Sequence, residues 1–164
     1  MKTLYLLRHA KSSWKDANLS DLERPLNRRG QRAAETLGRH FQTEEIVPDL
    51  VLCSPAIRTR ETIEIIVKTA KWRTEVRYDE RIYEAGAMRL FEVVSQIEND
   101  RKTALLVGHN PGLEELLQLL TGNIEQIPTG GLAEVVLKAS KWAAALQKKA
   151  VLKSFVKPKE LEQI

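Results

Sequence analysis

The sequence has few of the residues that several classes of protein require. Its 164 residues contain one cysteine, Cys53, which excludes an internal disulfide and a metal cluster held by thiolates. The first apolar run stops at Arg8, too early for a secretion signal, and no later run approaches the roughly 20 apolar residues of a membrane-spanning helix. We therefore expect a cytoplasmic protein with no membrane partner. Its length and its 43% hydrophobic content predict a single domain over residues 1–164.

Arginine is absent after Arg101, and this absence decides how we interpret the formal net charge of +4. From Lys138 to the end there are seven lysines and two glutamates, whereas the rest of the chain is nearly neutral. Lysine is weaker than arginine in planar, bidentate contacts with phosphates and base edges. The basic tail is therefore interpreted as a solvated surface, in which Lys153 and Lys157 guard an edge strand. Nucleic acid is not expected as a partner.

The hydrophobic pattern alternates between strands and helices. Near-continuous apolar runs, typical of strands buried on both faces of a parallel sheet, lie at 3–9, 49–54 and 103–109. Segments of helical period follow at 28–41, 56–70, 87–97 and 112–121. Further strands are predicted at 75–83 and 132–138, and an antiparallel one at 150–157. The fold class is therefore α/β, a three-layer α/β/α sandwich with a mainly parallel central sheet.

Only three histidines occur, and two of them end predicted strands. His9 follows the apolar run LYLLR, and His109 follows ALLVG in the same way. Ligands of open α/β sheets bind outside the carboxyl ends of the strands, so these two imidazoles are expected in one site. The third, His40, falls in the last turn of a predicted helix, where the helix dipole favours a cation, and is expected to be structural.

Two strand-to-helix joints share a pattern. Ser54 and Asn110 are predicted helix N-caps, and Pro55 and Pro111 are predicted first helical residues. A helix N-terminus carries free N–H groups and the positive end of the helix dipole, which favour an anion. Because both predicted N-termini point at the mouth of the sheet, the pattern predicts an anion site there.

Two arginines accompany the histidines. Arg8 precedes His9, and Arg58 falls in the first turn of the helix after Ser54, so both guanidiniums can bind phosphoryl oxygens. An imidazole can attack phosphorus and carry the phosphoryl group, while arginines stabilise the charge of the transition state. Departure of the leaving group calls for an acid, and Glu84 is the best-placed carboxylate. The weaker candidates are Glu80, Asp16, Asp21 and Glu23.

Other phosphate chemistries fit the sequence less well. For a cysteine-dependent phosphatase, the spacing from Cys53 to Arg58 is one residue too short, and Pro55 removes a backbone donor. Cys53 is instead predicted to be a buried residue at a strand end. Neither a His-x-His nor an HExxH motif accompanies the histidines, and no Gly-Lys-Ser/Thr loop occurs. We therefore expect neither a metal nor a nucleotide cofactor.

Five ordered blocks of the chain resemble the histidine phosphatase superfamily, also called phosphoglycerate mutase-like. The set is most similar to the short SixA-type phosphohistidine phosphatases, which share the RHA opening and the later HNPG. The resemblance implies the phosphoglycerate mutase-like fold and a metal-independent phosphatase. The blocks lie at residues 6–14, 21–30, 49–62, 105–116 and 128–137.

The same resemblance implies roles for the site residues. His9 is the nucleophile that becomes phosphorylated, and the phosphoryl group is bound and stabilised by residues around it. Glu84 matches the position at which larger relatives carry the proton donor, although a phosphoramidate leaving group is basic and needs less help. The expected substrate-binding residues are Arg8, Arg58, His109 and Asn110.

The segment between His9 and the helix that starts near Arg28 is too short to hold a lid domain. Residues 20–27 are expected to rim an open pocket, where Arg24 pairs with a neighbouring acid, and residues 128–131 form either another wall or a plain turn. An open pocket favours a phosphohistidine on a phosphorylated protein as substrate. The alternatives are a phosphatase or mutase acting on a small phosphorylated substrate, and a phosphate-binding module without turnover.

Overall fold

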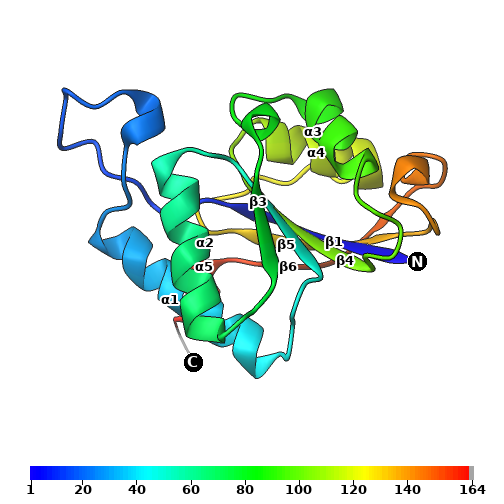
Figure 1. The fold of residues 1–164 in the computed structure, drawn as a ribbon, viewed down its shortest axis with the longest axis horizontal. Helices are drawn as coiled ribbons and strands as arrows, with labels where there is room; N and C mark the ends of the chain where they lie inside the picture. Colours follow the sequence, from blue (N-terminus) through cyan, green and yellow to red (C-terminus); the bar gives the residue numbers. More distant parts are fainter. Residues whose placement is uncertain (163–164) are drawn as a thin grey trace.

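The computed structural model describes residues 1–162 and contains one six-stranded sheet with the order β3-β2-β4-β1-β5-β6 (Figure 1). The first four strands pair in parallel, while β5 pairs antiparallel with β1 and with β6. This confirms the mainly parallel sheet and the antiparallel last strand. The strands are β1 (Lys2–Arg8), β2 (Leu50–Cys53), β3 (Glu75–Tyr78), β4 (Thr103–Gly108), β5 (Leu132–Leu137) and β6 (Val151–Val156).

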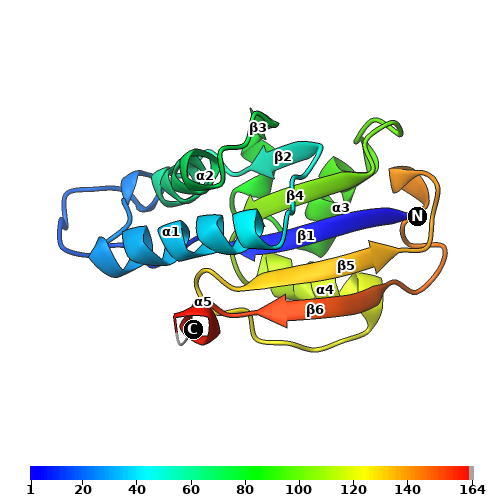
Figure 2. The same ribbon diagram turned by 90° about the horizontal axis from the view of Figure 1, so that it is seen from below.

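Helices cover both faces of this sheet, so the predicted three layers are confirmed. One face carries α1 (Arg28–Thr43), α2 (Ile57–Ala70) and the short α5 (Pro158–Leu161), and the other carries α3 (Ala87–Ser95) and α4 (Gly112–Thr121), as Figure 2 shows. Three 3-10 turns complete the fold of the described residues: η1 (Asp21–Glu23), η2 (Glu80–Ile82) and η3 (Trp142–Ala144). Within residues 1–162, no helix combines the length and the apolar character needed to cross a membrane.

The central strand β1 shows why the layers form. Leu4 and Leu6 pack into the core under α3 and α4, whereas Tyr5 and Leu7 pack into the core under α1 and α2. Alternate side chains of a strand point to opposite faces, and here both faces are buried, so the run is apolar throughout. Burial of each such leucine contributes about 1.5–3 kcal/mol, which fixes the strand and the residues at its carboxyl end.

The structure corrects the predicted helix starts. Helix α2 begins at Ile57 and α4 at Gly112, so Pro55 and Pro111 both precede their helices. Ser54 and Asn110 are not the helix caps, because Ala56 and Pro111 occupy those positions. The Ser54 hydroxyl is 2.8 Å from a histidine ring nitrogen, and the Asn110 amide donates to the Ile127 carbonyl at 2.7 Å.

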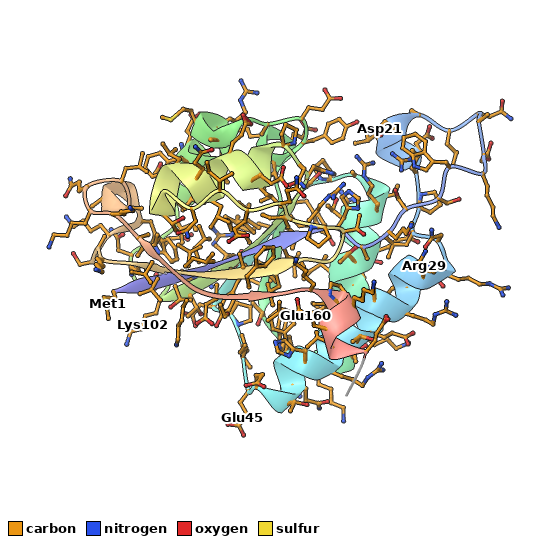
Figure 3. The ribbon with its side chains drawn as sticks, turned by 180° about the vertical axis from the view of Figure 1, so that it is seen from behind. Met1, Asp21, Arg29, Glu45, Lys102 and Glu160 are labelled. Atoms are coloured by element: carbon orange, nitrogen blue, oxygen red, sulfur yellow. The ribbon has the colours of Figure 1, made fainter. Side chains whose placement is uncertain are left out.

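The strand predicted at 75–83 is also shorter than expected. It ends at Tyr78, because the Asp79 side chain accepts a hydrogen bond from the Arg81 N–H and turns the chain into η2. The helix predicted at 87–97 ends at Ser95, and α5 was not predicted. Figure 3 shows Asp21 and Arg29 at the carboxyl end of β1, far from Met1 and Lys102 at its amino end.

Candidate active site

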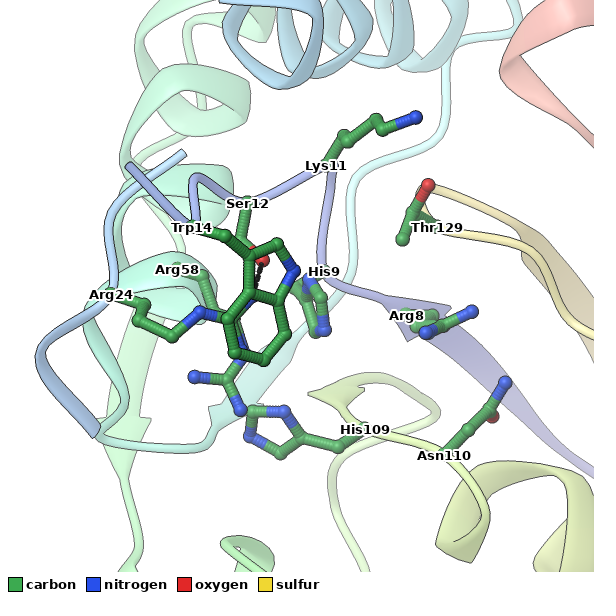
Figure 4. A pocket seen from close by; sticks show the side chains of 10 residues that line it. All are labelled: Arg8, His9, Lys11, Ser12, Trp14, Arg24, Arg58, His109, Asn110 and Thr129. Carbon is green, nitrogen blue, oxygen red and sulfur yellow. Dashed lines mark hydrogen bonds between the residues drawn. The ribbon is translucent and has the colours of Figure 1, made fainter. Parts of the chain in front are cut away.

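The carboxyl ends of β1 and β4 and the start of α2 enclose a pocket of about 300 Å³ (Figure 4). It gathers five of the six residues predicted for the site, and Glu84 is the one it leaves out. The polypeptide brings these five together from three separate segments. The lining residues are Arg8, His9, Lys11, Ser12, Trp14, Arg24, Arg58, His109, Asn110 and Thr129.

His9 has a defined ring orientation. It follows β1 directly, its backbone N–H donates to the Gly108 carbonyl, and its side chain is 6% exposed. The ring Nδ1 lies 2.7 Å from the Ala10 carbonyl oxygen, which can only accept, so Nδ1 carries the proton. The lone pair therefore resides on Nε2, the ring nitrogen that remains available for attack on a ligand.

The second imidazole lies beside the first, with ring centroids 5.3 Å apart. His109 Nε2 is 2.8 Å from the buried Ser54 hydroxyl, which itself accepts a hydrogen bond from the Ala56 N–H. The Ser54 hydroxyl can donate its hydrogen to Nε2, and in that tautomer the proton of His109 is on Nδ1. His109 then presents an N–H donor at Nδ1.

Three buried polar atoms of the pocket residues have no hydrogen-bond partner within residues 1–162: Arg8 Nε, His109 Nδ1 and Asn110 Oδ1. Buried polar groups in folded proteins are nearly always paired, and an unpaired one is costly. Two of the three are nitrogen atoms of donor groups. The pocket therefore offers buried donors to an electron-rich ligand.

Hydrogen bonds to other parts of the chain hold both predicted arginines in position. Arg8 donates to the Ile127 carbonyl at 3.1 Å, and Arg58 donates to both the backbone carbonyl and the carboxylate of Asp21, at 2.7 and 3.0 Å. These bonds hold the guanidiniums in fixed directions before any ligand arrives. Fixed cations stabilise a charged transition state without the cost of reorganisation.

Arg24 has a larger part than the sequence suggested. Its expected pair with Asp21 is present at 2.9 Å, but the guanidinium is also buried, lines the pocket and bonds to Ser12 and to the Ser13 carbonyl. It stacks 3.2 Å from the ring of Trp14, an indole that is 77% exposed. A third arginine and an aromatic side chain thus join the site.

Sequence reasoning missed several of these residues. Lys11, Ser12 and Trp14 follow His9 directly, so proximity to a strand-end histidine was the signal that could have found them. The exposure of Trp14, which marks it because large aromatic side chains are usually covered, is visible only in the folded structure. Thr129 lies in the segment 128–131, so this segment does form a wall of the pocket.

Asp21 links the arginines to a tyrosine. Its carboxylate accepts hydrogen bonds from the Tyr83 hydroxyl at 2.6 Å, from Arg58 and from Arg24. The Tyr83 bond, followed by those of Arg58 and Arg24, lowers the pKa of Asp21 to about 2. Asp21 is therefore ionised and holds the arginines in place, and it has no proton to give at neutral pH.

Glu84 lies outside the pocket lining. It is exposed and its backbone has a positive φ of 53°, in the loop that follows η2. The structure therefore does not bring this carboxylate to His9 and His109, and its role as a proton donor stays a prediction.

Cys53 is confirmed as a buried residue at the end of β2. Burial raises the pKa of its thiol far above the ordinary value, so it is not a thiolate. Arg60 points away from the pocket, because it donates to the Pro55 carbonyl and stacks on Tyr78. The cysteine-dependent alternative is thus unsupported by geometry as well as by spacing.

Both imidazoles of the pocket are neutral at neutral pH. Burial, assisted by the charges of Arg58 and Arg8, lowers the pKa of His9 to about 4. Burial, again with the charge of Arg58, lowers the pKa of His109 to about 3. Protonation would place a cation among arginines in a desolvated site. The neutral state keeps the His9 lone pair available for attack.

These low pKa values predict that acid weakens the fold. A histidine of ordinary pKa in the unfolded chain binds a proton near pH 6.5, whereas folded His9 does so only near pH 4, so the unfolded state gains protons first as pH falls. Between these values, His9 alone is expected to lower the free energy of unfolding by about 3 kcal/mol. Urea unfolding measured from neutral pH downward checks this.

The matched control for that experiment is the third histidine. The variant His9→Asn/His109→Asn should lose much of the slope of stability against pH, while His40→Asn, on α1 outside the pocket, should keep it. An unchanged slope in the double variant would contradict the assignment of buried, neutral imidazoles.

Comparisons with known proteins agree with this geometry. The family model of the histidine phosphatase superfamily (branch 1) matches residues 4–103. An uncharacterised protein of Mycobacterium leprae is 31% identical, with 93% of this chain and 100% of the relative covered. An uncharacterised chloroplast protein of Arabidopsis thaliana is 31% identical, with 88% of this chain and 70% of the relative covered.

A similar solved structure is a protein from Nakamurella multipartitia assigned as the phosphohistidine phosphatase SixA. It is 26% identical, with 96% of both chains covered and a TM-score of 0.85. Its similarity confirms the phosphoglycerate mutase-like fold. Family match, fold and the paired imidazoles at the sheet edge lead to one assignment: the chain belongs to the histidine phosphatase superfamily.

Proposed function

We propose that this protein is a metal-independent phosphatase that removes the phosphoryl group from phosphohistidine on a protein through a phosphorylated His9. The observation that carries the proposal is the tautomer of His9. Its Nδ1–H donates a hydrogen bond to the Ala10 carbonyl, and its Nε2 lone pair is free beside Arg8, Arg58 and His109. Such an imidazole is a nucleophile ready to attack phosphorus.

In the first step, His9 Nε2 forms a bond to phosphorus while the bond from phosphorus to the leaving nitrogen breaks. The substrate imidazole arrives protonated on its other ring nitrogen, and the electron pair of the broken bond stays on the leaving nitrogen, so the leaving group departs as a neutral imidazole. Arg8, Arg58 and the Nδ1–H of His109 hold the phosphoryl oxygens, on which negative charge is concentrated. The Ala10 carbonyl keeps its hydrogen bond to Nδ1 and stabilises the positive charge of the phosphorylated ring.

In the second step, a water oxygen attacks phosphorus and the bond to Nε2 breaks. Its electron pair returns to the ring, which restores neutral His9, and the water proton passes to solvent or to the released phosphate. The same cations serve both steps, because the phosphoryl group occupies the same position in each.

We propose a protein as the substrate because one side of the pocket is open to solvent. Between His9 and α1 the chain forms only the 3-10 turn η1, which rims the site. A phosphorylated side chain on a folded partner can reach such a pocket. The similarity to a solved protein assigned as a phosphohistidine phosphatase supports the same substrate class.

A comparison of four substrates tests this function. Phosphohistidine protein should be hydrolysed with a higher kcat/KM than p-nitrophenyl phosphate, phosphoserine or phosphoglycerate, and EDTA should leave the rates unchanged. A preference for phosphoglycerate with isomerisation would instead indicate a mutase. Loss of activity in EDTA would overturn the metal-independent mechanism.

The variant Glu84→Gln separates two ways of protonating the leaving group. With phosphohistidine we expect kcat/KM to stay within about twofold of wild type, because the leaving imidazole arrives protonated on its other ring nitrogen and departs neutral without an enzyme acid. A fall of roughly 10²-fold confined to phosphoserine would assign Glu84 as a proton donor for poorer leaving groups. An equal fall with phosphohistidine would contradict the proposed first step.

A further inference from the structure

A second hollow, of about 440 Å³, adjoins the active-site pocket and is lined by positive charge. We call it the basic groove. Two of its cations come from α1, two come from the residues around α5, and one follows β1. The residues that define it are Lys11, Arg29, Arg32, Thr129, Lys157 and Lys159.

The groove joins parts of the chain that are far apart in the sequence. Helix α5 packs against α1, and Figure 3 shows the labelled Arg29 of α1 and Glu160 of α5 on the same side of the molecule. The basic tail thus brings Lys157 and Lys159 to the first arginines of α1. The two charged segments form one surface that neither forms alone.

The cations of the groove have no acidic partner within the described chain. All five are exposed, and none of them forms an ion pair with an acid in residues 1–162. Arg29 and Arg32 are moreover three residues apart on one helix, where like charges repel. One acid, Glu162, lines the groove. Repulsion among these cations destabilises the free protein, and an anionic partner would relieve the repulsion.

The groove is continuous with the active site. Lys11 and Thr129 line both hollows, and Figure 4 shows them on the side of the pocket opposite Arg24. The connection is also rigid. Gly130, at a positive φ of 73°, donates its N–H to the carbonyls of Arg8 and His9, at 3.0 and 2.9 Å.

Pro158 ties the basic tail to this turn. It is buried, and a Cβ placed on Gly130 would lie 2.6 Å from Pro158 Cγ, so only glycine allows this close approach. Lys157 and Lys159 flank Pro158 and are thereby held at a fixed place relative to His9. A ligand with its phosphoryl group at His9 can therefore extend over Lys11 into the groove.

We propose that the basic groove binds an acidic segment of the substrate protein, with aspartate or glutamate side chains close to the phosphorylated residue. This inference rests on the proposed function. Five cations spread around a groove of this size exceed what one phosphate group can contact. The uncharged part of the lining is formed by Ala33, Pro128, Thr129 and Pro158, and no aromatic side chain of the described chain lines it. Within the groove itself, bases of a nucleic acid would therefore find no aromatic ring on which to stack.

Phosphohistidine peptides with acidic flanks and with neutral flanks test the groove. We expect wild-type kcat/KM to be about tenfold higher for the acidic peptide, and added salt to reduce this preference. The variant Arg29→Glu/Arg32→Glu/Lys159→Glu changes cations that line the groove but not the pocket. It should lose the preference and keep its activity on p-nitrophenyl phosphate.

The matched control reverses the same number of charges elsewhere. Lys141, Lys148 and Lys149 lie around η3, at the opposite end of the sheet from α5 (Figure 2), and their reversal to glutamate should keep the preference. Equal rates for both peptides with wild type, or equal loss in both variants, would overturn the proposal. So would a single-stranded oligonucleotide that displaces the acidic peptide at lower concentration than the peptide itself binds.

A binding measurement separates failure of the groove from failure of the proposed function. Fluorescence anisotropy of labelled peptides on His9→Ala reports docking without turnover, and the acidic peptide should bind about tenfold more tightly than the neutral one. Tight, charge-dependent binding by His9→Ala, together with no hydrolysis of either peptide by wild type, would overturn the phosphatase and retain the groove. Hydrolysis of both peptides by wild type at equal rates, with equal binding by His9→Ala, would retain the phosphatase and overturn the groove.

Discussion

Replacing His9 by alanine is expected to lower kcat/KM for phosphohistidine protein by about 10³-fold or more, the scale of loss when a covalent nucleophile is removed. Among residues 1–162, no other group with an available lone pair occupies the same position, since His109 Nε2 is hydrogen-bonded to Ser54 and Cys53 is buried. Steady-state kinetics with wild type and variant give the ratio directly.

Two further variants test whether the loss of activity in His9→Ala comes from misfolding. His9→Asn keeps a polar side chain of similar reach at the floor of the pocket and should lose activity as fully as His9→Ala. His40→Ala, on α1, should retain wild-type rates. Activity within about tenfold of wild type in either His9 variant would remove His9 from the role of nucleophile.

Replacing Arg58 by alanine is expected to lower kcat by roughly 10²- to 10³-fold, the usual loss when one fixed charge opposite a developing anion is removed. Arg58 is buried and held by Asp21 on one side, so its guanidinium has little freedom to turn away from the phosphoryl group. The loss should appear mainly in kcat, because the charge of the transferring group is concentrated in the transition state.

Arg60 provides a control on the same helix. It lies two residues further along α2, stacks on Tyr78 and does not line the pocket. Arg60→Ala should keep kcat within about twofold of wild type, as is usual for changes away from a catalytic site. Similar losses in both variants would show that Arg58 acts through the stability of α2 and not through the phosphoryl group.

Much of the fold could be predicted from the sequence because its central strands are buried on both faces. Leu4, Leu6 and Leu7, with Tyr5 between them, form an unbroken buried run in the middle of β1, and such a run is typical of a central strand of a layered fold. The helix starts were harder to place. Ser54 has a cap-forming side chain, but α2 starts later, after Ala56, and the Ser54 hydroxyl also contacts His109, a residue 55 positions away.

In the site, too, contacts between residues far apart in the sequence could not be predicted. His9 and His109 could be predicted because strand ends are recognisable in sequence, and strands of one parallel sheet end at the same edge. Arg24 could not, because its place depends on Asp21, Ser12 and the ring of Trp14 in an irregular loop. The lysine tail was interpreted as a solvated surface for the same reason. Its proximity to Arg29 and Arg32 arises only when α5 packs against α1.

The most direct test of the account is to trap the phosphorylated enzyme. Wild-type protein is mixed with a radiolabelled phosphodonor, quenched in alkali within a turnover, digested and analysed by mass spectrometry. We expect one acid-labile phosphoryl group per chain, on the peptide that contains His9, and none in His9→Ala. Label on another residue, or full turnover by wild type with no trapped phosphoryl group, would contradict catalysis through phosphorylated His9.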